Sequence, residues 1–327
     1  MGIVRRLVGV LILLTVLALS WAHRPDRPVE TLVARWAPAP SEFVELRGQL
    51  VHLRDEGPRH TGAGSPPPLV LLHGTASSLH TWEGWARALR GQHRVLSVDL
   101  PGFGLTGPFA GEYEPDNYHG DAYARFVIDL LQARGIERAV IAGNSLGGEV
   151  AWRTAHAAPA RVAALVLVDS LGPVFVPEVV PPVFLAARTP VLSKLVEWAL
   201  PRELVAQSLQ SVYGDPTRIT PELVDRHYEL ALRDGNRRAL VERFRHQRLG
   251  EHAERLATLR LPTLILWGGR DRLVPPSVGR QLADTIPGSR LVMFPELGHV
   301  PQEEDPAATL VPLREFLATL EVSAAPD

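Results

Sequence analysis

The segment that most clearly carries chemistry is the pentapeptide Gly-Asn-Ser-Leu-Gly at residues 143–147, which follows an apolar run and precedes a helical pattern. A serine on a tight turn between a strand and a helix presents its hydroxyl above the sheet edge, and its flanking glycines are needed because a Cβ there would collide with neighbouring backbone. The amide of Leu146 opens the helix and points its N–H toward the place where an oxyanion forms. The pattern therefore predicts that Ser145 is the nucleophile of an acyl-transfer reaction.

A serine nucleophile needs a base and an acid, and both candidates follow later strand-like runs. His299 lies in a loop between the run 290–294 and the last helical pattern. Asp271 ends the preceding run, where a carboxylate can accept a hydrogen bond from the imidazole and stabilise it once it holds the serine proton. We therefore expect a triad of Ser145, His299 and Asp271. Asp169 also ends a core strand downstream of the serine and stays an alternative acid.

Acyl transfer needs a second oxyanion donor from a neighbouring loop. The sequence His-Gly-Thr at residues 73–75 ends an earlier apolar run, and the amide of Thr75 is the candidate beside that of Leu146. We expect His73 to brace this loop and not to transfer protons. The serines at positions 77 and 78 are expected to cap the following helix.

Composition excludes several other chemistries. The chain of 327 residues has no cysteine, which rules out disulfides, thiolate metal sites and a cysteine nucleophile. With 34 Lys+Arg against 36 Asp+Glu, its net charge of −2 offers no surplus of positive charge to a nucleic acid. Because no metal-ligand pattern or nucleotide-binding loop occurs, we expect no metal and no other cofactor. The expected partner is a small molecule.

Short apolar runs that alternate with amphipathic stretches must position these residues. Alternation of strands and helices predicts an α/β protein with a doubly wound, mostly parallel sheet and helices on both faces. Ligands in such sheets bind beyond the carboxyl ends of the strands, where the candidate residues lie. A hairpin is predicted first, from residues 43–46 and 49–53. The buried parallel strands are predicted at 69–72, 95–98, 139–142, 164–168 and 263–267, and residues 290–294 form a further strand-like run.

This alternation stops between residues 172 and 256, where prolines and helical patterns replace the strands. Its position predicts a helical cap inserted into a core formed by residues 43–171 and 257–327. Histidines of this stretch, such as His227, are expected on the surface or within the cap. Apolar cap side chains can line a substrate pocket or pack against one another. The candidate pocket residues are Phe175, Phe184, Trp198 and Leu209 of the cap, and Val300 beside the base.

Residues 1–24 have the pattern of a targeting segment. Two early arginines precede an uncharged apolar stretch at 7–22, which ends in small residues. We expect a cleaved signal peptide or an uncleaved membrane anchor, and hence an exported or membrane-anchored protein. The proline- and arginine-rich stretch 25–42 is expected to be a linker.

The motifs together resemble those of the α/β-hydrolase superfamily, over about residues 43–320. The resemblance implies the same triad, although the acid of this superfamily can follow either of two strands, which leaves Asp169 as the alternative to Asp271. The inserted cap is similar to that of carbon–carbon bond hydrolases, haloalkane dehalogenases, epoxide hydrolases and many esterases. Dehalogenases and epoxide hydrolases of that branch use an aspartate nucleophile, and Ser145 counts against both. The matching segments are His-Gly-Thr at 73–75, Asp-Leu-Pro-Gly-Phe-Gly at 99–104, residues 143–148, Gly-Arg-Asp at 269–271 and Gly-His at 298–299.

Three functions stay open from the sequence. The first is a serine hydrolase that cleaves small to medium carboxylic esters through an acyl-enzyme. The second is a carbon–carbon bond hydrolase of the meta-cleavage product type, or an acyltransferase, on the same triad. The third belongs to another class, a noncatalytic binding protein with a hydrolase-like fold, although the complete triad counts against it. The oligomeric state stays open.

Overall fold

The structure is a computed structural model of the chain. It describes residues 23–59, 65–113 and 117–324, together with Gly2, Arg5, Arg6, Gly9 and Val10; over 321–324 it describes the backbone alone. Most of the segment expected to be a signal or anchor, residues 1–24, lies outside the described residues. Among the helices that are described, none is both long and apolar enough to cross a membrane.

An eight-stranded sheet forms the centre, in the order β1-β2-β4-β3-β5-β6-β7-β8. The first two strands form the predicted antiparallel hairpin, β2 pairs antiparallel with β4, and all the other pairs are parallel. The prediction of a doubly wound, mostly parallel sheet is confirmed. The strands are β1 (Ser41–Leu46), β2 (Gln49–Glu56), β3 (Leu69–Leu72), β4 (Val95–Val98), β5 (Ala139–Asn144), β6 (Val162–Val168), β7 (Thr263–Gly268) and β8 (Arg290–Phe294).

The central strands are buried on both faces because helices cover both sides of the sheet. Alternate side chains belong to different clusters: Leu72 and Ile141 face one cluster, whereas Leu71 and Ala142 face the other. This explains why the strands read as continuous apolar runs rather than alternating ones. Helices α4 (Gly120–Ala133), α5 (Leu146–Ala157) and α11 (Pro276–Thr285) contribute to the first cluster, and α3 (Glu83–Leu89) and α13 (Pro306–Ala324) to the second.

Strand register brings the predicted site loops together. Leu72 pairs with Gly143, so the loop after β3 and the turn after β5 leave the sheet side by side. Val168 pairs with Leu266, and Gly268 pairs with Phe294, so the loops after β6, β7 and β8 follow in the same row. The carboxyl ends of neighbouring parallel strands therefore gather the candidate residues at one edge.

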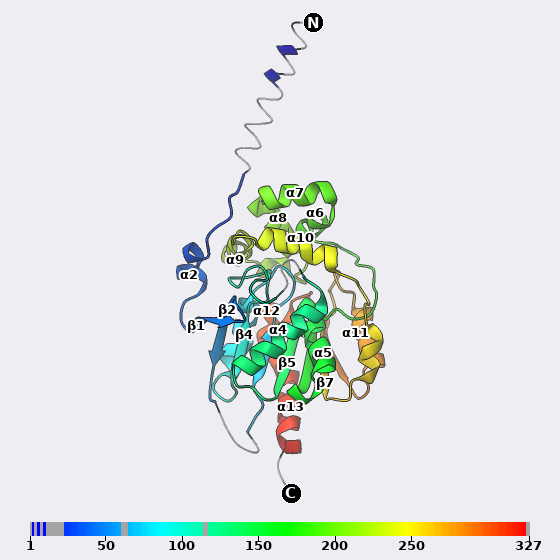
Figure 1. The fold of residues 1–327 in the computed structure, drawn as a ribbon. Coiled ribbons are helices and arrows are strands. Elements are labelled where there is room, and N and C mark those ends of the chain that lie inside the picture. Colours follow the sequence, from blue (N-terminus) through cyan, green and yellow to red (C-terminus); the bar gives the residue numbers. More distant parts are fainter. Residues whose placement is uncertain are drawn as a thin grey trace.

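Helices alone lie between β6 and β7, in a stretch that the structure describes throughout, apart from irregular segments. Figure 1 shows them stacked beyond one end of the sheet, over the site loops. Short helices fit the composition of this stretch, because prolines begin three of them at positions that need no amide hydrogen. They are α6 (Pro182–Arg188), α7 (Pro190–Trp198), α8 (Arg202–Gln210), α9 (Pro221–Ala231) and α10 (Asn236–His246).

The stretch 25–42, expected to be a linker, is packed against the rest of the molecule. It contains helix α2 (Glu30–Trp36), whose Leu32 and Trp36 are buried with Leu230 of α9. The Trp36 indole also donates to Glu229, at 2.7 Å. The linker expectation was wrong because apolar side chains spaced four positions apart form one helix face within an otherwise polar, proline-rich stretch.

Candidate active site

Ser145 occupies a strained turn between β5 and α5. Its backbone has φ 55° and ψ −115°, a region that non-glycine residues rarely adopt. The turn depends on glycines at close approaches: a Cβ on Gly143 would lie 2.1 Å from the carbonyl oxygen of Gly147, and one on Gly147 would lie 2.1 Å from that of Leu72. Strain of this kind persists only where the surroundings over-determine it, and it concentrates at functional sites.

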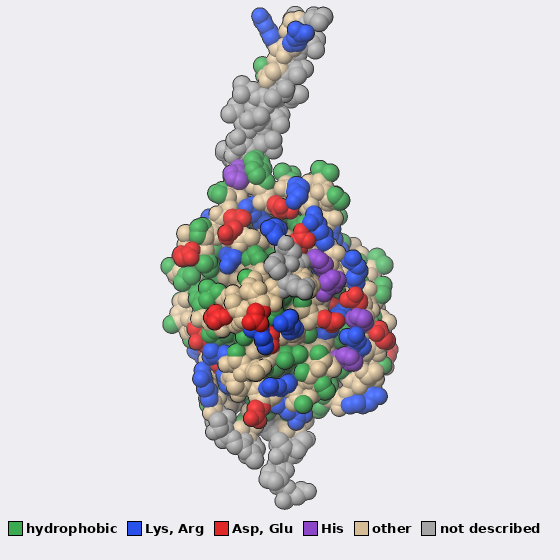
Figure 2. Space-filling model, in the orientation of Figure 1, with side chains coloured by type: hydrophobic (Ala, Val, Ile, Leu, Met, Phe, Trp, Pro, Cys, Tyr) green, Lys and Arg blue, Asp and Glu red, His purple; other side chains and the backbone are tan. Residues whose placement is uncertain are grey.

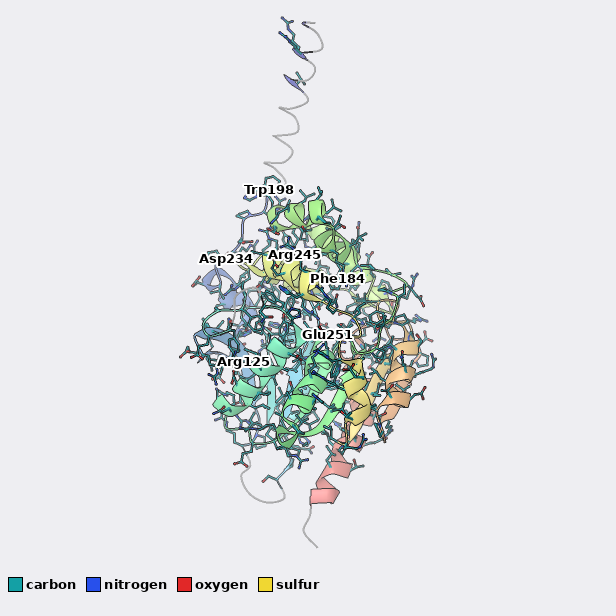
Figure 3. All side chains as sticks on the ribbon, turned by 45° about the vertical axis from the view of Figure 1, so that its right-hand side comes forward. Arg125, Phe184, Trp198, Asp234, Arg245 and Glu251 are labelled. Carbon is teal, nitrogen blue, oxygen red and sulfur yellow. The ribbon has the colours of Figure 1, made fainter. Side chains whose placement is uncertain are left out.

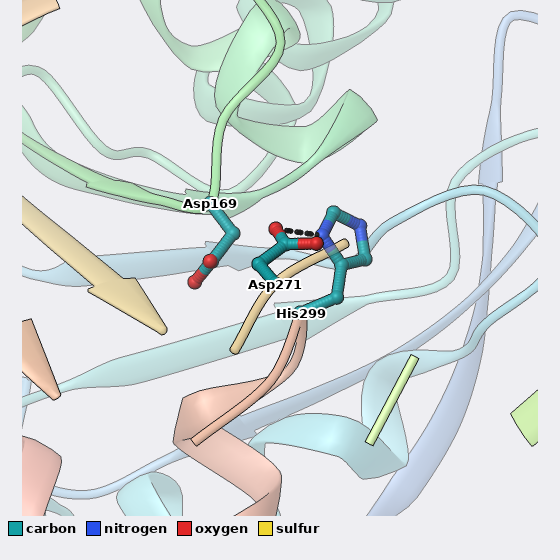
Figure 4. Close-up of side chains that lie close together, drawn as sticks. All are labelled: Asp169, Asp271 and His299. Carbon is teal, nitrogen blue, oxygen red and sulfur yellow. Dashed lines mark hydrogen bonds and ion pairs between the residues drawn. The ribbon is translucent and has the colours of Figure 1, made fainter. Parts of the chain in front are cut away.

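His299 and Asp271 form a buried hydrogen-bonded pair. The distance from His299 Nδ1 to Asp271 Oδ2 is 2.7 Å, and Figure 4 shows this bond. Asp271 Oδ1 accepts from the amides of Leu273 and Val274, at 2.8 and 2.9 Å, which fixes the carboxylate. The backbone oxygen of His299 accepts from the Asn144 side chain at 2.9 Å. With Nδ1 engaged, the Nε2 atom of the imidazole is the one that can accept a proton.

Asp169 lies in the same buried cluster but does not hold the histidine. Carboxylate oxygens of Asp169 and Asp271 and a ring nitrogen of His299 all lie within 4.8 Å of one another. One Asp169 oxygen accepts from the Gly268 amide at 3.0 Å, and the other has no hydrogen-bond partner among the described residues. Burial and the adjacent Asp271 carboxylate raise the pKa of Asp169 well above its usual range. Asp169 is therefore a neighbour of the pair whose environment favours its protonated form.

The predicted oxyanion donors lie beside the nucleophile. Gly74 passes so close that a Cβ there would lie 3.2 Å from the Ser145 Cβ, and Thr75 lines the same cavity as Ser145. Leu146 is the first residue of α5, where amides have no acceptor within the helix. The two amides are therefore available to an oxygen bound above Ser145.

His73 and Asp99 brace the loops around this position. His73 Nδ1 donates to the Gly74 carbonyl at 2.7 Å, and its Nε2 accepts from the Leu100 amide at 2.9 Å, so both ring nitrogens are occupied. Asp99 accepts from the amides of Leu79 and Leu105, at 2.7 and 2.8 Å. These bonds assign both residues to loop structure.

The serines at 77 and 78 differ from the expectation. Ser78 precedes the short 3₁₀ helix Leu79–Trp82, but its side chain makes no capping bond and lies 3.0 Å from His80 Nδ1. The first amide of this helix, that of Leu79, donates instead to the Asp99 carboxylate. Ser77 lines the cavity that contains Ser145.

A cavity of about 120 Å³ lies between the core and the cap, and both Ser145 and His299 line it. Three of the predicted pocket residues, Phe184, Leu209 and Val300, also line it. Most of its other cap residues are apolar, and the polar ones are Ser208, Tyr213, His227, Asn236 and Arg237. The apolar ones are Pro181, Val183, Val196, Leu200, Val205, Val212, Leu230, Ala231 and Leu240.

Phe175 and Trp198 were wrongly predicted to line this pocket. Phe175 is partly buried in the segment that enters the cap, against the core cluster. Trp198 ends α7 and stacks on His23, with ring centroids 4.9 Å apart. On α7 the residue that reaches the cavity is Val196, and a position two residues further along a helix points to a different side.

Several polar residues in the cavity lining were not predicted as site residues, among them His227 and Arg237 of the cap. His227 lines it and its Nδ1 donates to the Ala76 carbonyl at 3.2 Å; burial and the neighbouring Arg226 lower the pKa of His227 to about 4. Arg237 also lines it, and its Nε donates to Asp26 at 3.1 Å. The sequence carries no signal for either, because their place depends on how the cap folds over the core.

Comparison with known proteins agrees with this geometry. Residues 67–306 match the family model described as the alpha/beta hydrolase fold, which is most of the chain. The chain belongs to the α/β-hydrolase family. It is an α/β hydrolase in which Ser145, Asp271 and His299 occur in the chain order serine, acid, histidine that is typical of the family.

Relatives of this α/β hydrolase have more than one activity. A 2-hydroxy-6-oxononadienedioate/2-hydroxy-6-oxononatrienedioate hydrolase of Burkholderia vietnamiensis is 30% identical over 84% of this chain and 92% of its own. Among solved structures, a meta-cleavage product hydrolase of Pseudomonas fluorescens matches 85% of this chain and 97% of its own, with a TM-score of 0.71 and 27% identity. A thermophilic esterase of Thermogutta terrifontis matches 86% of this chain and 99% of its own, with a TM-score of 0.68 and 25% identity.

Proposed function

We propose that this α/β hydrolase cleaves neutral carboxylic esters with small to medium apolar groups. The observation that carries the proposal is the apolar cap lining above a serine held at a strained turn. Such a lining favours the uncharged acyl or alcohol part of an ester over a charged group, because an unpaired charge is costly to bury.

The arrangement supports a two-step reaction. Ser145 Oγ attacks the ester carbonyl while His299 Nε2 accepts its proton, and Asp271 stabilises the resulting imidazolium. The amides of Thr75 and Leu146 bind the oxyanion. The intermediate expels the alcohol, which takes the proton from His299 and leaves an acyl group on Ser145. Water then attacks the acyl-enzyme by the same route and releases the carboxylic acid.

Charge in the cavity favours esters over dianionic substrates. The name of the Burkholderia vietnamiensis relative specifies a dioate, which carries two carboxylates. Arg237 is the one arginine among the described residues that line this cavity, no lysine lines it, and Asp26 already binds the Arg237 guanidinium. His227 is neutral at pH 7, since its pKa is lowered to about 4. The cavity therefore offers little positive charge for a second anion.

Carbon–carbon bond hydrolysis is the second candidate, and the relatives favour it. Two of the matches reported above are named for that reaction or its substrate class. An acyltransferase on the same triad is a variant of either function, in which an alcohol replaces water in the second step. A noncatalytic binding protein is disfavoured by the strained Ser145 turn and by the His299–Asp271 bond, since neither is needed to hold a ligand.

A substrate screen separates these functions. Purified protein is assayed on p-nitrophenyl esters of increasing acyl length and on a vinylogous 1,5-diketone acid, with and without an added alcohol. We expect ester hydrolysis with a maximum at small to medium acyl length and no cleavage of the diketone. Faster turnover of the diketone would establish the carbon–carbon hydrolase, transfer to the alcohol in excess of hydrolysis would establish the acyltransferase, and no turnover at all would favour a binding protein.

We also propose that residues 1–22 direct the protein to the membrane or across it. The support is the sequence pattern alone, two early arginines followed by an uncharged apolar stretch. Fractionation of cells that express the full chain, beside a chain that begins at His23, tests this. We expect only the full chain in the membrane or exported fraction, and the same soluble distribution of both chains would overturn the proposal.

A further inference from the structure

The cap has an apolar outer face as well as an apolar inner one. We define the outer cap face as the exposed large apolar residues of α6 and α7. They are Leu185, Val191, Leu192 and Leu195, with exposed fractions between 41% and 80%. Elsewhere in the described chain the exposed large apolar residues are Val174 and Val176, in the segment that enters the cap, and the scattered Val10, Leu50 and Val311. A gathering of this kind on a protein surface marks a contact with an apolar partner.

Helices α6 and α7 carry the outer cap face, and other residues of the same two helices line the cavity. Val183 and Phe184 of α6 line the cavity, whereas Leu185 is exposed. Val196 of α7 lines it, whereas Leu195 is exposed. A helix whose solvent-exposed residues are apolar, as well as those that line the cavity, is suited to contact an apolar environment outside the protein. One layer of helices therefore separates the outer cap face from the substrate cavity.

The N-terminal chain reaches the body of the protein beside this face. His23 stacks on Trp198 at the end of α7, and the Arg24 amide donates to the Trp198 carbonyl at 3.2 Å. Figure 3 labels Trp198 at the cap end of the molecule, and Figure 2 shows some apolar side chains at that end, among charged and polar ones. The uncharged apolar stretch at 7–22 directly precedes His23. The chain that is proposed to enter the membrane is therefore held within a few residues of α7.

Further contacts hold this attachment in place. Asp26 binds the Arg237 guanidinium, whose Nη2 also donates to the Arg24 carbonyl at 2.8 Å. The Arg27 amide donates to the Leu232 carbonyl at 2.6 Å. Residues 24–27 are thus bonded to α10 and to the end of α9. These bonds keep the cap close to His23, the first residue after the apolar stretch.

We propose that the outer cap face docks on the lipid bilayer that receives residues 7–22. The inference rests on the proposed membrane attachment and not on the proposed chemistry. Apolar side chains on α6 and α7 would enter the boundary between headgroups and acyl chains, as the apolar side of a helix lying in a membrane interface does. Docking would place the cavity one helix layer from the lipid, so an ester dissolved in the bilayer would have a short path to Ser145.

Fluorescence quenching tests this with the full chain, because the protein has no cysteine and accepts single labels. Variants Leu185→Cys and Leu192→Cys carry an environment-sensitive dye, and Leu50→Cys and Val311→Cys are matched controls at exposed apolar positions outside the cap. Each is reconstituted in vesicles of phosphatidylethanolamine and phosphatidylglycerol, with or without nitroxide-labelled lipid. We expect quenching by the labelled lipid at positions 185 and 192 and none at 50 and 311.

Each other result has a distinct meaning. Vesicle-bound protein without quenching at 185 and 192 would overturn docking while leaving the anchor intact. Equal quenching at all four positions would also overturn it, because the contact would then not be confined to the cap. Contact between dyes that increases with protein concentration, without quenching by the lipid, would overturn membrane docking. It would show that the outer cap face binds a second copy of the protein. Full chain that stays free of vesicles would overturn both anchor and docking, and ester turnover by the same samples reports separately on the proposed chemistry.

Discussion

Two buried aspartates lie near His299, and their hydrogen bonds give them different roles. Asp271 accepts from His299 and from two backbone amides, whereas Asp169 accepts from one amide. Burial and the adjacent Asp271 carboxylate raise the pKa of Asp169. The hydrogen bonds therefore place Asp271 to stabilise an imidazolium, and Asp169 is a neighbour whose protonated form is favoured.

Replacement of Ser145 by alanine tests the nucleophile. Without its hydroxyl no acyl-enzyme can form, and the acceleration that remains from the oxyanion amides is roughly 10³–10⁴ over water. We expect Ser145→Ala to lose turnover and labelling by a fluorophosphonate while keeping its thermal unfolding midpoint. Ser77→Ala is the matched control, because Ser77 lines the same cavity. Labelling that disappears with Ser77 and survives in Ser145→Ala would move the nucleophile.

Replacement of Asp271 or Asp169 by asparagine tests which of the two is the acid of the triad. Asp271→Asn keeps the shape but donates to the imidazole and favours the wrong tautomer, so kcat should fall by about 10⁴. Asp169→Asn should cost far less, because Asp169 makes no bond to His299. Both kcat values are measured across pH with circular dichroism as a check on folding. The reverse ranking, in folded proteins, would assign the acid to Asp169.

Asp169 also affects how stability depends on pH. Burial raises its pKa far above the ordinary 3.8, so above that pH the native state keeps a proton that the unfolded chain releases. Stability from this group is present at low pH and is lost as pH rises toward the folded pKa. We expect the unfolding midpoint of Asp169→Asn, relative to the native chain, to increase from pH 4 to pH 8. The exposed Asp284→Asn is the control, and a difference that does not change with pH would contradict this protonation state.

At the scale of elements, the turn between β5 and α5 depends on backbone contact. Gly147 lets α5 begin against the end of β3, where a Cβ would lie 2.1 Å from the Leu72 oxygen. Backbone cannot move aside as a flexible side chain can, so the substitution must displace the helix start. The helix start positions the Leu146 amide, and stability and chemistry therefore share this contact.

Replacement of Gly147 by alanine should therefore reduce both the stability of the fold and the reactivity of Ser145. We expect Gly147→Ala to lower the free energy of unfolding by about 1–3 kcal/mol, or more if the turn cannot adjust, and to slow fluorophosphonate labelling of Ser145. Gly91→Ala is the control, because no atom lies within 4 Å of a Cβ built there. Chemical denaturation and labelling rates are the measurements. Equal free energies of unfolding in the two variants would show that the close contact between α5 and β3 does not contribute to stability.

At the scale of the whole molecule, the N-terminal stretch ties the cap to the rest of the chain. Asp26 binds the buried Arg237, and Trp36 of α2 is buried beside α9. A guanidinium in the cavity wall therefore has its counter-ion on a segment more than 200 positions away. Loss of the pairing leaves a buried charge without its anion.

Substitution of Asp26 measures this connection. We expect Asp26→Asn to lower the free energy of unfolding by roughly 1–2 kcal/mol, since Asp26 is partly exposed and solvent screens the pair. Glu30→Gln, in the exposed first turn of α2, should change little. The comparison is made by thermal unfolding at low and high salt. If the two variants unfold alike at low salt, the Asp26–Arg237 pair does not stabilise the cap.

The amino-acid sequence by itself determined the sheet, its strands and the residues at their carboxyl ends. Those features are local: apolar runs of four to seven residues form buried strands, and Gly-Asn-Ser-Leu-Gly at 143–147 carries the steric needs of its own turn. Strand order then placed Ser145, Asp271 and His299 at one edge, so these residues could be proposed from position in the chain.

Tertiary structure alone decided which aspartate binds His299, which cap residues face the cavity and where the N-terminal stretch lies. Asp169 and Asp271 both end core strands, and only the distance of 2.7 Å to His299 separates them. Trp198 and Val196 are two positions apart on one short helix, and the packing of that helix selects which faces inward. Contacts between distant segments depend on the summed packing of the chain, which no local pattern encodes.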